Sequence, residues 1–324
     1  MKFDISNNTK EHWDDEISIN STSSIFNSYN WGEYKRNHGW NIIRIIERSN
    51  KNIKLQLLIK NYYFFSIVWS PGIEIINNIK FKNQLQKAIK ETLNIKIIYL
   101  RIRFININKI NNYDELLKNG WNKPLFLLST NQTLIYDLSN FNNNIKANKL
   151  LSKNWKRNLT RSNNYNNNVS VWKNPDAKEI FQLYHDLEKF KKLPQQFTLK
   201  SIKSIINLFN KSLIIIKCED NYGNLISIRG AIVYKESALD IFAASTYQGK
   251  KQYSNYITFW RLLEECSKKN ISNYDLGGVD MINNKSVYNF KKGIGSNDFA
   301  FLGEFDWSNI LFFRKIINYL IKIF

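Results

Sequence analysis

The sequence predicts an α+β protein of two tandem domains, each with a mixed, mostly antiparallel sheet flanked by helices. With 324 residues, the chain is longer than one hydrophobic core usually serves. Hydrophobic residues make up 43% of it and aromatic residues 15%, which is enough for packed cores. Both halves also show one order of elements: a helix, three strands, a helix, a strand, a helix and a strand. No sequence identity between the halves is visible, so only the pattern repeats.

The first half opens with a helix at 24–37, and three apolar strands follow it. The turn residues Ser49-Asn50-Lys51-Asn52 separate the first two strands, and Pro71-Gly72 ends the third. We expect these strands at 40–48, 53–60 and 62–69. The remaining elements of this half are a helix at 81–93, a strand at 95–104, a short helix at 113–119 and a strand at 125–138.

The second half opens with a helix at 146–162, a strand at 168–172 and a helix at 176–191. A three-strand meander follows, with turn residues at Asp220-Asn221-Tyr222-Gly223-Asn224 and Lys235-Glu236-Ser237. We expect its strands at 212–218, 225–234 and 238–245. The remaining elements are a helix at 254–269, a strand at 271–279, a helix at 284–291 and a strand at 298–305.

The polar run Asn142-Asn143-Asn144 predicts a boundary between a first domain at 1–145 and a second domain at 146–305. We expect the last segment, 306–324, to form a helix that packs back on the first domain. The tail from 309 onward is amphipathic and is too short and too charged to span a bilayer. The alternative is a peripheral membrane contact through 309–324, which would serve a lipid-linked substrate.

The chain is strongly basic, with 47 Lys and Arg residues against 27 Asp and Glu residues and a net charge of +20. Such an excess raises the local concentration of polyanions, so nucleic acid, nucleotide-linked substrates and anionic membranes are candidate partners. The first residues are polar, with no apolar stretch typical of a signal peptide, and we expect a cytoplasmic protein. The three histidines and two cysteines are scattered, so we expect no metal site.

The most informative segment is Tyr274-Asp275-Leu276-Gly277-Gly278, which reads as a buried strand that ends in two glycines. A short helix with Phe290-Lys291-Lys292 follows, and a second glycine turn comes after it. Glycines let the backbone approach a ligand closely or adopt a positive φ. A lysine beside such a loop is a point charge aimed at a phosphate or at an oxyanion formed during a reaction. Solvated lysines after a strand and a turn are the alternative interpretation.

Four segments in this order resemble the Fem-type (FemABX) aminoacyltransferases, which have two tandem GNAT-like N-acyltransferase domains. The first is the helix with Trp31 and Lys35, four residues apart and on one face. The second is Thr133–Ser139, similar to the strand that closes the first domain of these enzymes. The others are the basic helix Leu151–Arg161 and the signature segment from Tyr274 to Gly295. No long paired-helix insertion is present, so the chain looks more like the compact members that act on a nucleotide-linked precursor.

The resemblance implies roles for particular lysines and aromatic residues. It makes Lys291 the group that stabilises the oxyanion or the leaving group, with Phe290 shielding the site, and makes Lys35 the ligand of an acceptor phosphate beside Trp31. Where the relatives' second-domain helix carries an arginine, this chain offers Lys191 and Lys192 for substrate binding. Because Lys153, Arg157 and Arg161 recur every four residues, they form one basic stripe with Lys156 beside it, suited to a tRNA backbone. A solvated helix face is the alternative for such a stripe.

The resemblance therefore implies an enzyme, active as a monomer and without a cofactor, that joins an acyl group from aminoacyl-tRNA to an amine of a peptidoglycan or nucleotide-sugar precursor. The first alternative is an N-acyltransferase on the same fold that uses acyl-CoA as donor and acts on an amino sugar of a surface glycan. Its phosphate cradle would lie at Ser245–Tyr256, which holds one glycine where the pattern wants two or more. The second alternative is a non-catalytic module that binds RNA or a membrane.

Overall fold

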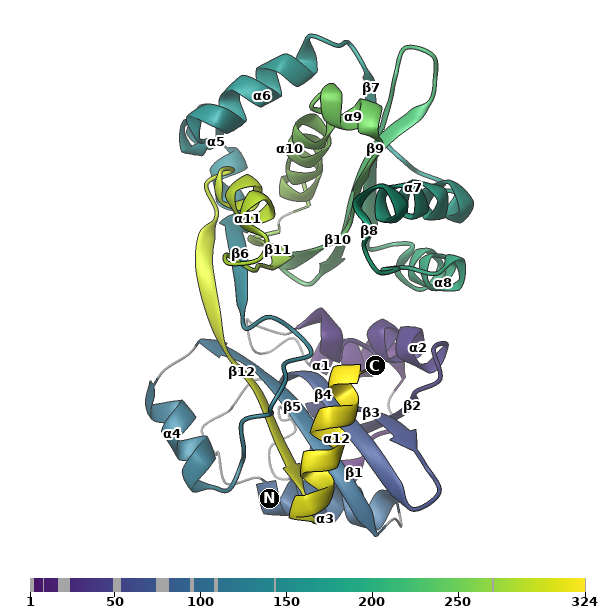
Figure 1. The fold of residues 1–324 in the computed structure, drawn as a ribbon, viewed down its shortest axis with the longest axis vertical. Coiled ribbons are helices and arrows are strands. Elements are labelled where there is room, and N and C mark those ends of the chain that lie inside the picture. The colour runs from purple at the N-terminus through teal and green to yellow at the C-terminus, as the bar shows by residue number, and fades with distance from the viewer. Residues whose placement is uncertain are drawn as a thin grey trace. The chain divides into compact units, whose positions relative to one another are not determined.

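Contacts divide the chain into two units: Met1–Asn131 with Ala300–Phe324 (unit 1), and Gln132–Phe299 (unit 2). The structure is a computed structural model that describes residues 3–7, 9–16, 24–48, 54–73, 82–93, 96–107, 110–142, 144–269 and 271–323 (Figure 1). The predicted boundary at 145/146 thus lies inside unit 2. The α+β class with mixed, mostly antiparallel sheets is confirmed.

Unit 1 is built on a sheet in the order β1-β2-β3-β4-β5-β12, in which only β4 and β5 run parallel. The strands are β1 (Phe3–Ile5), β2 (Asn41–Glu47), β3 (Lys54–Asn61), β4 (Phe65–Ile73), β5 (Ile97–Ile107) and β12 (Asn297–Ser308). The helices are α1 (Lys10–Glu16), η2 (Ile25–Asn27), α2 (Tyr29–Arg36), α3 (Lys82–Leu93), α4 (Ile110–Lys118) and α12 (Leu311–Ile323). Of these strands, β12 begins in unit 2 and continues into unit 1.

Unit 2 is built on a sheet in the order β6-β11-β10-β9-β8-β7, in which only β10 and β11 run parallel. The strands are β6 (Gln132–Asp137), β7 (Asn168–Val171), β8 (Leu213–Glu219), β9 (Leu225–Tyr234), β10 (Ser237–Ser245) and β11 (Asn273–Gly278). The helices are η4 (Leu138–Asn142), α5 (Asn144–Leu150), α6 (Lys153–Asn163), α7 (Ala177–Lys191), α8 (Leu199–Phe209), α9 (Tyr247–Lys251), α10 (Ser254–Ser267) and α11 (Lys285–Lys292). Helix α10 covers one face of this sheet, and α7 lies on the other (Figure 1).

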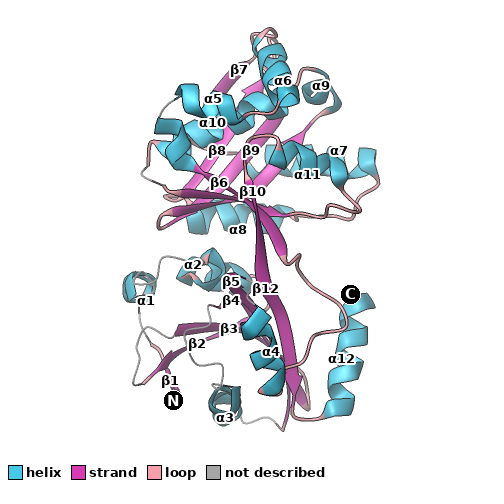
Figure 2. Cartoon of the chain, turned by 90° about the vertical axis from the view of Figure 1, so that its left-hand side faces the viewer, coloured by secondary structure: helices cyan, strands magenta, loops and turns pink. Residues whose placement is uncertain are grey.

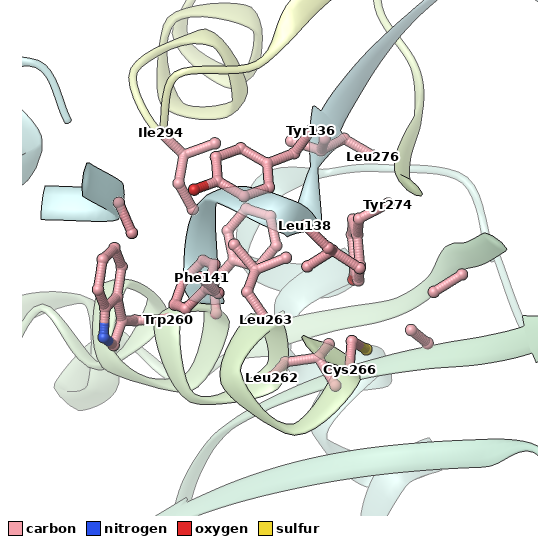
Figure 3. Close-up of a cluster of buried hydrophobic side chains, with 14 of the residues drawn as sticks. Tyr136, Leu138, Phe141, Trp260, Leu262, Leu263, Cys266, Tyr274, Leu276 and Ile294 are labelled. Carbon is pink, nitrogen blue, oxygen red and sulfur yellow. The ribbon is translucent and has the colours of Figure 1, made fainter. Parts of the chain in front are cut away.

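The two closing strands are exchanged relative to the prediction. Thr133–Ser139 was expected to close the first domain, but β6 pairs antiparallel with β11 of unit 2. The strand expected at 298–305 in the second domain is β12, and from Phe301 onward it pairs antiparallel with β5 of unit 1. The core explains the place of β6, because Leu134 and Tyr136 are fully buried among apolar residues of α10 and β11. Figure 3 shows this cluster, with Tyr136, Leu138, Phe141, Trp260, Leu262, Leu263, Cys266, Tyr274, Leu276 and Ile294 labelled.

Several predicted elements differ in extent. The helix expected at 146–162 is two helices, because the Ser152 side chain accepts from the Trp155 N–H and starts α6 anew. The strand expected at 125–138 begins only at Gln132, and the residues before it form a loop. The helix expected at 24–37 is likewise two helices, η2 and α2, because the Ser28 side chain caps the start of α2. Helices α1, α8 and α9 and strand β1 were not predicted.

Candidate active site

A cavity of about 560 Å³ lies in unit 2 where two neighbouring strands separate. Strands β10 and β11 pair in parallel only from Ser237 to Leu239 and from Asn273 to Asp275, respectively. Beyond this point, the end of β10 and the end of β11 both line the cavity, together with residues of α7 and α11. Ligands of sheets with parallel strands commonly bind at the carboxyl ends of those strands.

Lys291 reaches into this cavity from α11. Its Nζ donates to the carbonyl oxygens of Gly278 at 3.1 Å and Gly277 at 3.3 Å. An ammonium has three N–H donors, so one remains for a substrate atom. Among the described residues, no ion pair includes Lys291, and its burial lowers its pKa, an effect that the carboxylates of Asp240 and Asp275 oppose. The neighbouring Lys292 instead forms a surface ion pair with Asp298 at 2.5 Å.

The two glycines aim their carbonyl groups at Lys291 because the backbone departs from the strand there. Gly277 has a φ of +73°, a value that L side chains rarely adopt. The pairing of β11 with β6 shifts register between Asp275 and Gly278. The carboxylate of Asp275 holds this bulge, since it accepts from the N–H of Gly277 at 2.8 Å and from the hydroxyl of Thr133. Asp275 thus positions the backbone at the end of β11.

A buried ion pair forms one wall of the cavity. Arg229 of β9 donates with Nε to Asp240 Oδ1 at 2.8 Å and with Nη2 to Asp240 Oδ2. The hydroxyl of Tyr274 donates to the same carboxylate at 3.0 Å. Both partners of the ion pair lie in adjacent strands and are almost fully buried. This pair was not predicted, although one charged residue in each of two apolar strands could have indicated it.

Phe290 connects the cavity to the basic helix α6. Its carbonyl oxygen accepts from Trp155 Nε1 at 2.7 Å, and its ring packs against the rings of Trp155 and Tyr256, with centroids 5.1 Å away in each case. The side chain also lines the cavity. The position of α11, and therefore of Lys291, thus depends on Trp155 of α6.

The predicted basic stripe lies on the exposed face of α6. The opposite face buries Trp155, Asn158 and Ser162. All four predicted residues are exposed, and no ion pair among the described residues includes any of them; these are Lys153, Lys156, Arg157 and Arg161. Arg161 also donates to the hydroxyl of Tyr253 at 3.1 Å. The stripe is therefore available to a polyanion.

The structure separates the two lysines predicted at the end of α7. Lys191 lines the cavity, together with Lys250 of α9. The two ammonium groups repel each other, and the pKa of Lys250 is lowered by burial and by Lys191. Lys192 does not line the cavity; it ends α7 in a left-handed conformation with a φ of 53°. Lys250 belongs to the junction Ser245–Tyr256, which the sequence offered as a phosphate-binding segment for the acyl-CoA alternative.

Lys35 lies in unit 1, within a cluster of aromatic rings. Its Nζ is 5.3 Å from the ring centroid of Trp31, 5.6 Å from that of Tyr34 and 5.7 Å from that of Trp69. Burial lowers the pKa of Lys35, and the charge of Lys60 lowers it further. The indole N–H groups of Trp31 and Trp69 are buried and have no hydrogen-bond partner among the residues that the structure describes. The cluster thus offers donors and positive charge but no acidic group.

The sequence matches the model of one known protein family. A family model described as the FemAB family matches residues 74–322. The chain belongs to the FemAB family. No curated protein matches the chain in a sequence search. The recognition of a Fem-type chain from its four segments is confirmed, and membership of this family supports an acyltransferase activity.

Solved structures agree with this fold. A crystal structure of FemX has a TM-score of 0.78 at 13% identity, over 98% of this chain and 100% of that chain. The C-terminal domain of a lysylphosphatidylglycerol synthetase from Agrobacterium fabrum has a TM-score of 0.57 at 10% identity, over 90% of each chain. A tandem GNAT protein from the clavulanic acid pathway has a TM-score of 0.55 at 8% identity, over 83% of each chain. At these identities the likeness concerns the fold.

Proposed function

We propose that this FemAB protein forms an amide between an amino acid carried on tRNA and an amine of a cell-wall precursor. The observation that supports this reaction best is the Lys291 ammonium, which two backbone carbonyls hold at the wall of a cavity and which forms no ion pair within the described part of the chain. A positive charge fixed in that way is suited to stabilising negative charge that develops on a reacting carbonyl. We place the reaction in the cytoplasm, where charged tRNA is made, and assign it to a monomer.

In this mechanism the acceptor amine attacks the ester carbonyl of the donor. A C–N bond forms, the carbonyl oxygen gains negative charge, and Lys291 donates its remaining N–H to that oxygen or to the leaving oxygen. The C–O bond then breaks, and the proton lost by the amine ends on the ribose hydroxyl of the tRNA. Because an aminoacyl ester is already activated, no protein nucleophile is needed. Phe290, packed on Trp155, would shield the reacting atoms from water.

The junction between β10 and α10 favours tRNA over acyl-CoA as the donor. A pyrophosphate cradle needs backbone N–H groups that are free to bind phosphate. Here the N–H of Gly249 donates to Thr246 Oγ1 at 3.0 Å, and that of Lys250 donates to Thr246 O at 3.1 Å. A Cβ on Gly249 would lie 2.3 Å from Ile226 O, so this glycine serves close packing against β9. We assign phosphate binding at this end of the cavity to the side chains of Lys191 and Lys250.

One experiment tests the reaction and the donor together. The purified protein is given charged tRNA and acyl-CoA in parallel, each with a peptidoglycan precursor and with an amino sugar as acceptor. We expect amide formation only with charged tRNA and the peptidoglycan precursor. Transfer from acyl-CoA alone would replace our proposal with the first alternative. RNA binding without transfer from either donor would favour a non-catalytic module.

We also propose that Lys35 binds a phosphate of the acceptor. We expect Lys35→Ala to raise the KM for the acceptor about tenfold or more and to change kcat little, because a phosphate ion pair binds ground state and transition state alike. Steady-state kinetics at varied acceptor concentration measure this. The matched control is Arg36→Ala, since Arg36 is the next residue on α2 but is exposed and paired with Glu33. An acceptor KM equal to that of the unaltered protein would remove Lys35 from the site.

The basic stripe on α6 is our proposed contact for the tRNA backbone. We expect Lys153→Ala and Arg157→Ala each to weaken tRNA binding at low salt and to reduce the slope of log K against log salt by about 1. Filter binding over a range of salt concentrations measures the slope. Lys203→Ala, which removes an exposed lysine of α8, serves as the control. If the slope of log K against log salt were the same for all variants, the stripe would be a solvated helix face and not a tRNA contact.

A further inference from the structure

Helix α12 turns polar side chains inward and several large apolar side chains outward. Asn318 is fully buried and donates to Asp306 Oδ2 at 2.6 Å, and Arg314 Nε donates to Asp306 Oδ1 at 2.6 Å. Leu311 and Phe312, in contrast, are 64% and 73% exposed. A helix on a water-soluble protein usually buries its apolar stripe, although here, among the apolar residues from Leu311 to Ile321, only Ile317 is fully buried. An exposed apolar face of this kind on α12 is typical of an interaction surface.

The turn between β3 and β4 extends this apolar face. Tyr63 is fully exposed at its tip, and Phe64 is 58% exposed. The turn is joined to α12 through Phe313, whose ring centroid is 4.8 Å from that of Phe65 and 6.4 Å from that of Phe64. An aromatic tip of this kind is costly to leave in water and is typical of a contact surface.

The loop before β6 adds three exposed leucines on another side of α12. Leu125, Leu127 and Leu128 are each about half exposed. The N–H of Leu125 donates to Asn318 Oδ1 at 3.0 Å, and the ring of Phe126 lies 6.2 Å from that of Tyr319. Figure 2 shows this loop passing beside α12. We call the combined patch the apolar surface of unit 1; it consists of Tyr62, Tyr63, Phe64, Leu125, Leu127, Leu128, Leu311, Phe312, Ile316, Tyr319 and Leu320.

The segments that form this surface carry basic but no acidic residues in their sequence. The three contributing segments, 60–64, 123–128 and 309–323, contain five basic residues and no Asp or Glu: Lys60, Lys123, Arg314, Lys315 and Lys322. The acidic side chains of β12 beneath them are buried and paired, Asp306 with Arg314 and Glu304 with Arg101. A second copy of the chain would bring like charges together, whereas an anionic lipid headgroup would complement them.

We infer that the apolar surface of unit 1 docks the protein on the surface of a bilayer with anionic headgroups. Tyr63, Phe64 and the outward side chains of α12 enter the boundary between headgroups and acyl chains, and Lys123 and Lys315 contact the headgroup phosphates. None of the helices in the described part of the chain has the length and hydropathy of a membrane span. This inference does not rest on the proposed reaction, because docking needs neither donor nor acceptor.

Vesicle flotation with the full chain tests the inference without substrates. We expect binding to vesicles of phosphatidylcholine mixed with phosphatidylglycerol, and at least about tenfold weaker partitioning for Phe312→Ser and for Tyr63→Ser. The control is Tyr222→Ser, which removes an equally exposed aromatic side chain from unit 2. Circular dichroism and thermal melting of each variant check that the fold is kept, and Tyr63→Ser alters only a turn tip.

A second arm addresses the charges and the other possible occupants. We expect Lys123→Glu with Lys315→Glu to abolish the preference for anionic vesicles over phosphatidylcholine alone, and added salt to weaken binding of the unaltered chain. Absence of vesicle binding, or an equal loss in the Tyr222→Ser control, would overturn the inference. So would a dimer in solution that Phe312→Ser converts to a monomer, since the surface would then join two copies.

Discussion

We expect Lys291→Ala to lower turnover about 100- to 1,000-fold while the protein still folds. The substitution removes an N–H donor that reaches into the cavity, and the remaining carbonyls of Gly277 and Gly278 would repel an oxyanion. Because only the transition state carries that negative charge, kcat should fall more than the affinity for either substrate. Single-turnover transfer of the amino acid under saturating substrates measures the effect.

Lys292→Ala is the matched control, because Lys292 is the next residue on the same helix but pairs with Asp298 at the surface. A surface pair of this kind contributes about 1 kcal/mol or less, so the control should retain most activity. The pH profile gives a further check on Lys291. Burial lowers its pKa below the ordinary value of 10.5, and only the protonated form donates, so activity should decline on the alkaline side before pH 10.5. Near-normal turnover of Lys291→Ala would remove it from the mechanism.

The second large effect concerns stability. We expect Asp240→Ala to lower the free energy of unfolding by about 3–5 kcal/mol, because it leaves the Arg229 guanidinium buried without a counter-charge. The hydroxyl of Tyr274 loses its acceptor in the same step. Urea denaturation followed by circular dichroism measures the change.

Two further variants separate the buried charge from other causes. Asp298→Ala removes the exposed partner of Lys292 and should cost about 1 kcal/mol or less. Arg229→Met combined with Asp240→Leu removes both charges, and this double variant should be more stable than Asp240→Ala alone. If the double variant were as unstable as the single one, packing in the strands rather than the unpaired charge would explain the loss.

Local patterns in the sequence predict most elements of the fold. The structure has the meander at 212–245 where the apolar runs and turn residues predict it. The same holds for strand β11 and for helix α11, which carries Lys291. The starts of α2 and α6 were predictable as well, because Ser28 and Ser152 stand at N-cap positions before helical residues. Helix α8 was overlooked, although Thr198 and Ser201 form a capping box at its start.

The partners of the closing strands could not be predicted in this way. A strand such as β6 shows its apolar face in the sequence, but not which edge it will join, because pairing depends on the tertiary fold. The same holds for the site. Lys291 was found because it stands beside two glycines. Arg229, Asp240 and Lys250 lie on the consecutive elements β9, β10 and α9, but no motif in this part of the sequence marks them as members of one site. The ring cluster around Lys35 also arises from separate elements, α2 and β4.

The exchange of β6 and β12 has a consequence for how the protein is made. Strand β5 ends at Ile107, yet its neighbour in the sheet begins about two hundred residues later, as the Arg101–Glu304 pair illustrates. During synthesis, the edge of β5 therefore stays unpaired until β12 has left the ribosome. If the chain were cut between 145 and 146, the N-terminal fragment would lack β12. The C-terminal fragment would carry β12 without its partner strand β5. We would thus expect neither half to be obtained alone in native form, and chaperones to matter for its yield in cells.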